Sequence, residues 1–576
     1  MPAQKPADDS AGYDIFPSFP LQEGVIYRQF QSLAAHIKNH RVVIIDGYIG
    51  VLWDELKEHL NEALENLAVE TYWVDVSHAF KPLVEIEFLV EPFLGGADPL
   101  FGSRTDLQLS DFFDVVKLKK IASDRSGFMT ILYGSGAFLT GVKGLNIYVD
   151  LPKNEIQYRS RAGSVANLGC SIAQDPKKMY KRFYFVDWIV LNRHKEQFID
   201  HVDVFADAQR PGEITWAAGN SVRATFDAMA VNYFRVRPWF EPGTWGGEWI
   251  KNHIRGLNPL VPNYAWSFEL ISPENGLILE SEGNLLELSF DWLMYRNASQ
   301  VLGHCHQRFG NEFPIRFDFL DTFAGGNLSV QCHPRREYMS ANFGEHFTQE
   351  ETYYILDAAP DASVFLGFAD NIDPVEFREA LETSALEQSP IEIEKYVQKH
   401  PSKKHDHFLI PPGTIHASGV NNLVLEISST PYIFTFKLYD WIRPDLDGKP
   451  RQLNITRGMD NLHFEYSGDF VTNELIAKPV LLKEGRNWKM WHLPTHPDHL
   501  FSVHRYEFTR EITIATDGRC HVLSLVEGSA VVVCTKSGMQ QRFSYAETFV
   551  IPAAAGSYRV INESPELAML VMAFVK

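Results

Sequence analysis

The segment NLSVQCHP (327–334) has the pattern of a β-strand and indicates the fold class of the larger part of this chain. Its residues alternate in character, as they do in a strand that has one face toward a core and the other toward a second environment. On such a strand Gln331 and His333 lie two residues apart and point to the same side, whereas Val330 and Cys332 point to the opposite side. The pattern therefore predicts a β-strand that presents an amide and an imidazole to a common space.

Two later segments carry side chains of the same chemical kind. Glu351 lies in QEETYYIL (349–356), which reads as the next strand, and His416 follows a Pro-Pro-Gly turn in LIPPGTIHASGVN (409–421). Two imidazoles, one carboxylate and one amide oxygen suit zinc or a neighbouring first-row ion and leave a coordination position for substrate. A single histidine on a strand more often only packs or hydrogen-bonds, so the hypothesis needs all four residues to meet.

The hydrophobic pattern divides the 576 residues into more than one domain, because the chain is too long for a single core. The apolar runs VVIID (42–46), FMTILYG (128–134) and LNIYVDLP (145–152) predict buried parallel strands. After about residue 225, short alternating strands split by Gly, Pro and Asn predict a jelly roll. The expected parts are a tail and linker helix over 1–40, an α/β domain over 41–205, a β domain over 225–475 with a helical insertion at about 371–405, and a final β domain over 485–576.

Composition narrows the class of partner. A formal net charge of -20 argues against nucleic acid, which needs a basic face, but leaves room for a small phosphorylated ligand. No apolar stretch is long enough to span a bilayer, and the N-terminus lacks the features of a secretory signal. The five cysteines form no CxxC pair, which favours a reduced, cytoplasmic setting over a disulfide framework.

The order of motifs over about 235–576 resembles that of type I mannose-6-phosphate isomerase, a family of zinc enzymes built on cupin barrels. The matching segments are RPWFEPGTWGGEWI (237–250), LSVQCHP (328–334), EETYY (350–354), PPGTIHA (411–417), LVLEIS (423–428), KLYDW (437–441) and ETFVIPAAAGSY (547–558). The resemblance implies all-β cupin (jelly-roll) domains and an isomerase that interconverts mannose 6-phosphate and fructose 6-phosphate through an enediolate.

Carried over position by position, the resemblance implies that one Zn²⁺ per chain is held by Gln331, His333, Glu351 and His416. It also implies that the C-terminal domain is the second cupin of the family. The turn IPAAAGSY (551–558) has no histidine where a metal ligand would sit, so we expect this second barrel to be structural.

Three positions depart from the family pattern. Gln349 stands where the family usually has Lys, and Asp318 replaces another frequent Lys, although Arg316 lies two residues earlier on the same strand face. Lys437 replaces an Arg of the family. We expect Lys437, Arg316 or Arg443 to act as a cation toward the phosphate or the transition state, and Glu350 or a group beside the ligands to act as the base.

These departures leave two other functions open. One is an isomerase of a different sugar or sugar phosphate. The other is a non-catalytic protein that senses a sugar or nucleotide with two degenerate enzyme domains. A small-molecule sugar phosphate is the expected ligand, and the sequence leaves the oligomeric state open.

The α/β block also resembles a known fold, that of uridine-kinase-like nucleoside kinases. The similar features are the strand–Asp–Gly start, GSG (134–136) after an apolar strand, and YVDLPKNEIQYRSR (148–161), which leads into an Arg-bearing helix. A working P-loop needs GxxxxGK[ST], but this chain has GYIGVLWD (47–54), without the Lys or the hydroxyl. The P-loop is therefore degenerate, and kinase activity is not expected.

Two roles remain for this block. A structural or dimerising role is the default interpretation. The alternative is a domain that binds a ligand or partner through Arg159, Arg161 and Arg193.

Overall fold

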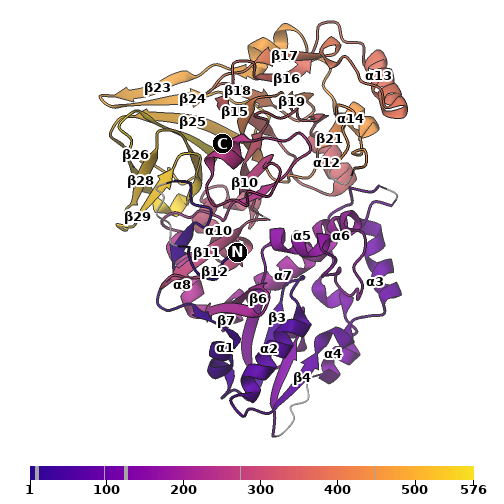
Figure 1. The fold of residues 1–576 in the computed structure, drawn as a ribbon, viewed down its shortest axis with the longest axis vertical. Helices are drawn as coiled ribbons and strands as arrows, with labels where there is room; N and C mark the ends of the chain where they lie inside the picture. The colour runs from indigo at the N-terminus through magenta and orange to yellow at the C-terminus, as the bar shows by residue number, and fades with distance from the viewer. Residues whose placement is uncertain (7–11, 97, 122–126, 273, 446–447) are drawn as a thin grey trace.

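The computed structural model describes residues 1–576 except 7–11, 97, 122–126, 273 and 446–447. Figure 1 shows an α/β unit at one end of the molecule and a larger, β-rich part at the other. Within the described ranges, no helix combines the length and the apolar character that crossing a membrane requires.

A mixed sheet forms the centre of the α/β unit. Its strands are β2 (Tyr27–Arg28), β3 (Val42–Gly47), β4 (Thr71–Asp75), β5 (Met129–Tyr133), β6 (Leu145–Asp150), β7 (Val204–Arg210) and β8 (Glu213–Ala218). Strands β4-β5-β3-β6-β7 lie parallel in this order, and β8 and β2 continue the sheet antiparallel. The three apolar runs predicted as buried parallel strands are β3, β5 and β6, so that prediction is confirmed.

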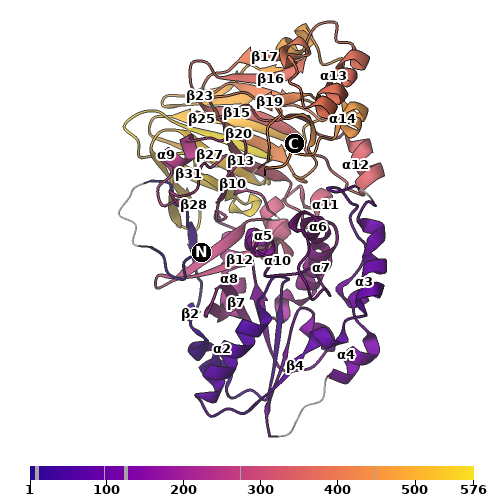
Figure 2. The same ribbon diagram turned by 45° about the vertical axis from the view of Figure 1, so that its right-hand side comes forward.

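Helices cover this sheet. They are α1 (Phe30–Ile37), α2 (Trp53–Glu65), α3 (Leu83–Val90), α4 (Val115–Ile121), α5 (Lys153–Arg161), α6 (Pro176–Arg182), α7 (Trp188–Phe198) and α8 (Gly219–Met229). Helix α2 buries Leu56, Leu60 and Leu64, a spacing of four residues that places all three on one face. In Figure 2, α5, α6 and α7 lie at the end of the unit that faces the β-rich part.

The first β unit consists of two sheets that share a hydrophobic core. One sheet contains, in order, β22 (Ile476–Ala477), β18 (His407–Ile410), β15 (Glu351–Ala358), β20 (Asn422–Ser429), β13 (Ile315–Asp321), β10 (Trp266–Leu270) and β9 (Trp239–Glu241). The other contains β17 (Val397–Pro401), β16 (Ser363–Phe368), β19 (His416–Ser418), β14 (Val330–Cys332) and β21 (Phe436–Tyr439). This arrangement is consistent with a cupin-like domain.

A helical insertion follows β16, as expected. Helix α13 (Pro374–Glu387) begins after Asp373, whose carboxylate accepts hydrogen bonds from the backbone N–H groups of the first turn. The next segment, 391–400, was also expected to be helical, and this is wrong. It makes a single 3₁₀ turn over Ile393–Lys395 and then forms β17, because pairing with β16 supplies a tertiary partner that local propensity does not reveal. Two further helices, α12 (Arg336–Phe343) and α14 (Ile455–Asn461), lie near β14 and β21.

The C-terminal unit is a second pair of sheets. One contains β23 (Val480–Gly485), β24 (Trp488–Leu493), β25 (Phe501–Phe508), β32 (Ala568–Val575), β27 (His521–Glu527) and β30 (Thr548–Ile551), in this order. The other contains β26 (Glu511–Ala515), β31 (Ser557–Asn562), β28 (Ala530–Thr535) and β29 (Gln540–Ser544).

The N-terminal segment does more than the expected tail and linker helix. Strand β1 (Ser18–Pro20) pairs in parallel with β11 (Gly276–Ser281), which in turn pairs with β12 (Asn284–Ser289). Phe19 of β1 is buried in the main core. A strand of three residues is too short for its periodicity to be visible in the sequence.

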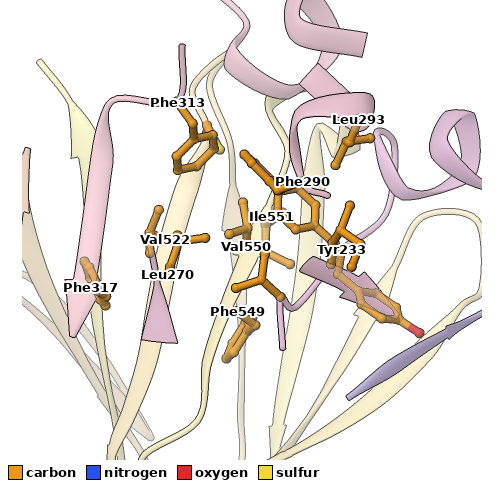
Figure 3. Close-up of a cluster of buried hydrophobic side chains, with 14 of the residues drawn as sticks. Tyr233, Leu270, Phe290, Leu293, Phe313, Phe317, Val522, Phe549, Val550 and Ile551 are labelled. Carbon is orange, nitrogen blue, oxygen red and sulfur yellow. The ribbon is translucent and has the colours of Figure 1, made fainter. Parts of the chain in front are cut away.

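An apolar cluster joins the two β units. Figure 3 shows Leu270 and Phe317 of the first unit against Val522, Phe549 and Ile551 of the second. Phe290 and Leu293, at the start of helix α10 (Asp291–Leu302), pack on the same cluster and connect it to the α/β unit. The β units are therefore held together by a shared core.

Candidate metal centre

Three ligand-type side chains meet inside the first β unit. They are His333, directly after β14, Glu351 at the start of β15, and His416 at the start of β19. One atom from each lies within 4.8 Å of the others, and all three side chains are buried. The two sheets thus bring together residues that are up to 83 positions apart (416 − 333) in the sequence.

Both imidazoles are oriented by backbone carbonyls. Nδ1 of His333 lies 3.2 Å from the carbonyl oxygen of Phe434, and Nδ1 of His416 lies 2.9 Å from that of Thr414. When Nδ1–H donates to these carbonyls, Nε2 of each ring is free to face Glu351 as a metal ligand. Burial lowers the pKa of His416 to about 4, so this ring is neutral at pH 7, as metal ligation requires.

The carboxylate of Glu351 stands between the two rings. Its Oε2 pairs with Nε2 of His333 and lies 3.7 Å from Nε2 of His416. Although burial acts to raise the pKa of Glu351, the adjacent His333 and His416 hold it at about 2. Its other oxygen, Oε1, is buried and has no hydrogen-bond partner among the residues that the structure describes. An ionised carboxylate with an unpartnered buried oxygen fits a metal ligand, because leaving such an atom unsatisfied is costly.

Gln331 lies at the edge of this cluster. It is paired in register with His416, and the two side-chain Nε2 atoms are 3.4 Å apart. Its amide oxygen accepts a hydrogen bond of 3.0 Å from the hydroxyl of Ser329. As a metal ligand, Gln331 would present this oxygen instead, which requires the amide to rotate.

Arg316 is not a free cation. It points into the same barrel from β13 but lies 3.4 Å from a carboxylate oxygen of Asp318 and pairs closely with Glu426. Despite the nearby guanidinium, burial raises the pKa of Asp318 to about 6. Glu426 was not singled out in the sequence, although it sits opposite Asp318 in the register of β20 and β13. A buried cation that pairs with two carboxylates has a structural role, because it balances their charge.

Glu350 also lies outside the metal cluster. Its carboxylate pairs with Arg336 and accepts a hydrogen bond from the backbone N–H of Leu500 in the C-terminal unit. Glu350 directly precedes β15, and these contacts direct its carboxylate away from the imidazoles that Glu351 contacts. The structure thus separates the expected base from the expected ligands.

Lys437 lies beside the candidate ligands. It is the cross-strand partner of Gln331 in the pairing of β21 with β14, so both side chains emerge on the same face. Burial, together with Arg451, lowers the pKa of Lys437 to about 8. The residue lines a cavity of about 830 Å³, which lies within the usual size range of small-molecule sites.

In the α/β unit, the turn after β3 is occupied by the protein's own contacts. The carboxylate of Asp46 accepts hydrogen bonds from the backbone N–H groups of Gly47, Gly136 and Phe138 at 2.7–2.9 Å, and Oδ2 lies 2.8 Å from Nε2 of His194. The GSG segment that resembled part of a kinase therefore anchors Asp46. The turn after β3 is thus closed by contacts within the α/β unit.

The C-terminal end of β6 is also occupied by contacts within the protein. Asp150, at the end of β6, accepts hydrogen bonds from Ser289 and Trp292, and it lies 3.3 Å from Lys195. Lys153 donates to Asp291 at 2.6 Å. Ligands of open α/β sheets bind at these strand ends, but here strand β12 and helix α10 are packed against them.

The three arginines proposed for ligand binding in this unit have partners within it or next to it. Arg159 donates to the carbonyl oxygens of Gly50, Ala208 and Gln209. Arg193 donates to the carbonyls of Leu107 and Thr105, and Arg161 pairs with Glu241. These contacts support the structural role, and the kinase resemblance stays a prediction.

Comparison with known proteins gives different results for the two parts. Residues 29–231 match a family model described as a domain of unknown function (DUF8485). The chain is 28% identical over 253 residues to the mannose-6-phosphate isomerase ManA of Bacillus subtilis, covering 42% of this chain and 74% of that protein. It is 25% identical over 326 residues to the "Probable mannose-6-phosphate isomerase GmuF" of the same organism, covering 56% of this chain and 95% of the relative.

Among solved structures, the mannose 6-phosphate isomerase from Bacillus subtilis aligns over 59% of this chain and 99% of its own, with 18% identity and a TM-score of 0.48.

Proposed function

We propose that the first β unit is a zinc-dependent aldose–ketose isomerase that interconverts mannose 6-phosphate and fructose 6-phosphate through an enediolate. The buried cluster of His333, Glu351 and His416 carries this proposal, because its donor atoms suit zinc and one carboxylate oxygen lacks a partner among the described residues. The curated relatives support a sugar-phosphate isomerase.

In this proposal His333, Glu351 and His416 hold the metal, and Gln331 completes the set. A divalent metal there would polarise the oxygen atoms on C1 and C2 and stabilise the negative charge that develops on them. Lys437 emerges beside Gln331, and its pKa of about 8 allows it to exchange a proton near neutral pH. We assign the proton transfer between C1 and C2 to Lys437 in place of Glu350, whose carboxylate faces Arg336 and Leu500.

A coupled assay with mannose 6-phosphate tests the proposal. The zinc-loaded protein is expected to turn over, whereas Lys437→Met is expected to bind zinc normally and lose at least 100-fold in kcat, as loss of a general acid–base does. Arg378→Met serves as a matched control, since Arg378 is exposed on α13 and pairs only with Glu382 on the same helix among the described residues. Turnover in Lys437→Met equal to that of the control would remove Lys437 from the mechanism.

The same assay addresses the other sugar substrates left open by Gln349 and by the pairing of Arg316. A panel of aldose and ketose phosphates is offered to the zinc-loaded protein. Turnover of another member in preference to mannose 6-phosphate would keep the isomerase and replace the substrate. No turnover of any member by zinc-loaded protein would contradict an isomerase function.

A further inference from the structure

We propose that the α/β unit forms one wall of the isomerase cavity and that Lys178 on its helix α6 binds the phosphate end of the sugar substrate. This inference rests on the proposed function and extends it, because it gives the α/β unit a direct part in substrate binding. It identifies the ligand of the cavity as a phosphorylated sugar whose phosphate lies far from the reacting carbons.

The cavity is built from both parts of the chain. Helix α3, the segment after it and the start of α6 contribute one side, and Lys437, Asp445, Arg451 and Gln452 contribute the other. Figures 1 and 2 agree in placing α3 and α6 on the side of the α/β unit that faces α12 and the first β unit. Ligand sites are common at such junctions between domains.

The junction around the cavity is tightly packed. Phe101 of the α/β unit stacks on Phe434 with ring centroids 5.7 Å apart, and Phe343 packs 5.5 Å from Phe101. Polar contacts cross the same junction. Arg457 pairs with Asp98 at 2.7 Å. The cavity is therefore a fixed feature between two docked surfaces.

One of these contacts leads directly to the metal cluster. The carbonyl oxygen of Phe434 is the group that lies 3.2 Å from Nδ1 of His333. Phe185 of the α/β unit also packs on the Phe434 ring, with centroids 6.1 Å apart. The α/β unit thus supports the backbone that orients a proposed metal ligand.

Lys437 lines the cavity on the side of the first β unit. Its cross-strand neighbour Gln331 lies at the edge of the metal cluster, so Lys437 connects the cavity with this cluster, whose own three residues are not among those that line the cavity. In a hexose 6-phosphate, the phosphate is at the opposite end of the sugar from C1 and C2. A substrate with its reacting carbons near Gln331 would therefore extend its phosphate outward along the cavity.

Lys178 is the cation best placed to receive that phosphate. It is exposed, lines the cavity, and has no ion-pair or hydrogen-bond partner for its ammonium among the described residues. Neighbouring cations are engaged elsewhere: Lys181 donates to the carbonyls of Leu94 and Asp98 at 2.7 and 2.5 Å, and Arg182 is paired with Asp187. A free ammonium on one wall is suited to a phosphate as a point charge.

Two of the acidic groups on the lining are paired with cations. Asp98 is held by Arg457, and Asp445 lies 3.7 Å from Lys177. Asp175 accepts hydrogen bonds of 3.1 Å from the backbone N–H groups at the start of α6. Glu87 and Glu91 of the α3 segment complete the rim.

Calorimetric titration of the zinc-loaded full chain tests the inference. Fructose 6-phosphate is titrated into wild type, Lys178→Glu and, as a control, Lys119→Glu, which lies on the exposed side of α4 away from the cavity. We expect Lys178→Glu to raise the Kd by roughly 10-fold or more, as the loss of a charge-assisted hydrogen bond to phosphate does. The Kd of Lys119→Glu and the zinc content of both variants are expected to stay unchanged.

Turnover is measured on the same samples so that the two proposals can fail separately. If mannose 6-phosphate turns over but Lys178→Glu and Lys119→Glu bind fructose 6-phosphate equally well, the wall proposal is wrong and the isomerase stands. If nothing turns over but Lys178→Glu still weakens fructose 6-phosphate binding, the isomerase is wrong and the phosphate site stands. If Lys178→Glu weakened the binding of unphosphorylated fructose to the same extent, the assignment of Lys178 to the phosphate would also be wrong.

Discussion

Replacing Glu274 by Gln is expected to stabilise the protein at alkaline pH and to have little effect in acid. Glu274 is buried where the α/β unit meets the first β unit. Its Oε2 accepts a hydrogen bond of 2.8 Å from Gln157 on α5, and its Oε1 accepts one from Tyr432. Burial raises the pKa of this carboxyl from 4.5 to about 7, although Lys153 acts to lower it.

The sign of the pH dependence follows from that shift. Because the folded state holds the proton more tightly than the unfolded state, the contribution of Glu274 is most favourable below pH 4.5 and is lost as the pH rises to about 7. A shift from 4.5 to about 7 corresponds to a loss of about 3 kcal/mol, which is an upper value. Gln resembles the protonated acid in shape and stays neutral, so the variant avoids this loss.

Urea unfolding of both proteins at pH 5 and pH 8.5 measures the difference. The free energies of unfolding should agree to within about 1 kcal/mol at pH 5, and the variant should be more stable at pH 8.5 by up to about 3 kcal/mol. Other buried carboxyls titrate in both proteins and cancel in the comparison. A variant that is less stable than wild type at pH 8.5 would show that the ionised Glu274 carboxylate does not destabilise the folded state.

Three further perturbations have defined outcomes. Phe101→Ala should cost about 3–5 kcal/mol of stability and weaken zinc binding by about 10–100-fold, because the Phe101 ring supports Phe434, whose carbonyl orients His333. Zinc affinity is measured by competition with a chelator, and an unchanged affinity would show that Phe101 does not act on the metal cluster. Arg316→Met should lower the free energy of unfolding by about 3–5 kcal/mol because it leaves two buried carboxylates unpaired, and an unchanged urea midpoint would contradict that pairing. Burial raises the pKa of the Cys332 thiol, so iodoacetamide should not alkylate it in native protein but should alkylate it in urea, as measured by intact mass. Rapid alkylation of the native protein would show that Cys332 is accessible to solvent.

The residues of the metal cluster could be predicted because short-range patterns specify them. The alternating pattern of NLSVQCHP predicts Gln331 and His333 on one face, and the Pro-Pro-Gly turn lies three residues before His416. The position of Glu350 could not be predicted in this way, because it precedes β15 and its carboxylate is held by Arg336 and Leu500.

Features that depend on distant segments were not accessible in this way. Strand β17 forms because β16 offers it an edge, and three-residue β1 is held by β11. The cavity wall combines Lys178 with Lys437, which are 259 positions apart (437 − 178) and lie on units with separate sheets. The spacing of apolar residues within one segment does not show which faces of two domains will pack together.

Whether His333, Glu351 and His416 hold a catalytic metal is tested by the zinc content of wild type and His416→Ala. The conversion of fructose 6-phosphate is followed by NMR in the same samples. We expect one zinc per wild-type chain, with conversion to mannose 6-phosphate, and loss of both in a folded His416→Ala protein. Full conversion by His416→Ala, or by wild type stripped of metal, would rule out a catalytic metal at this cluster.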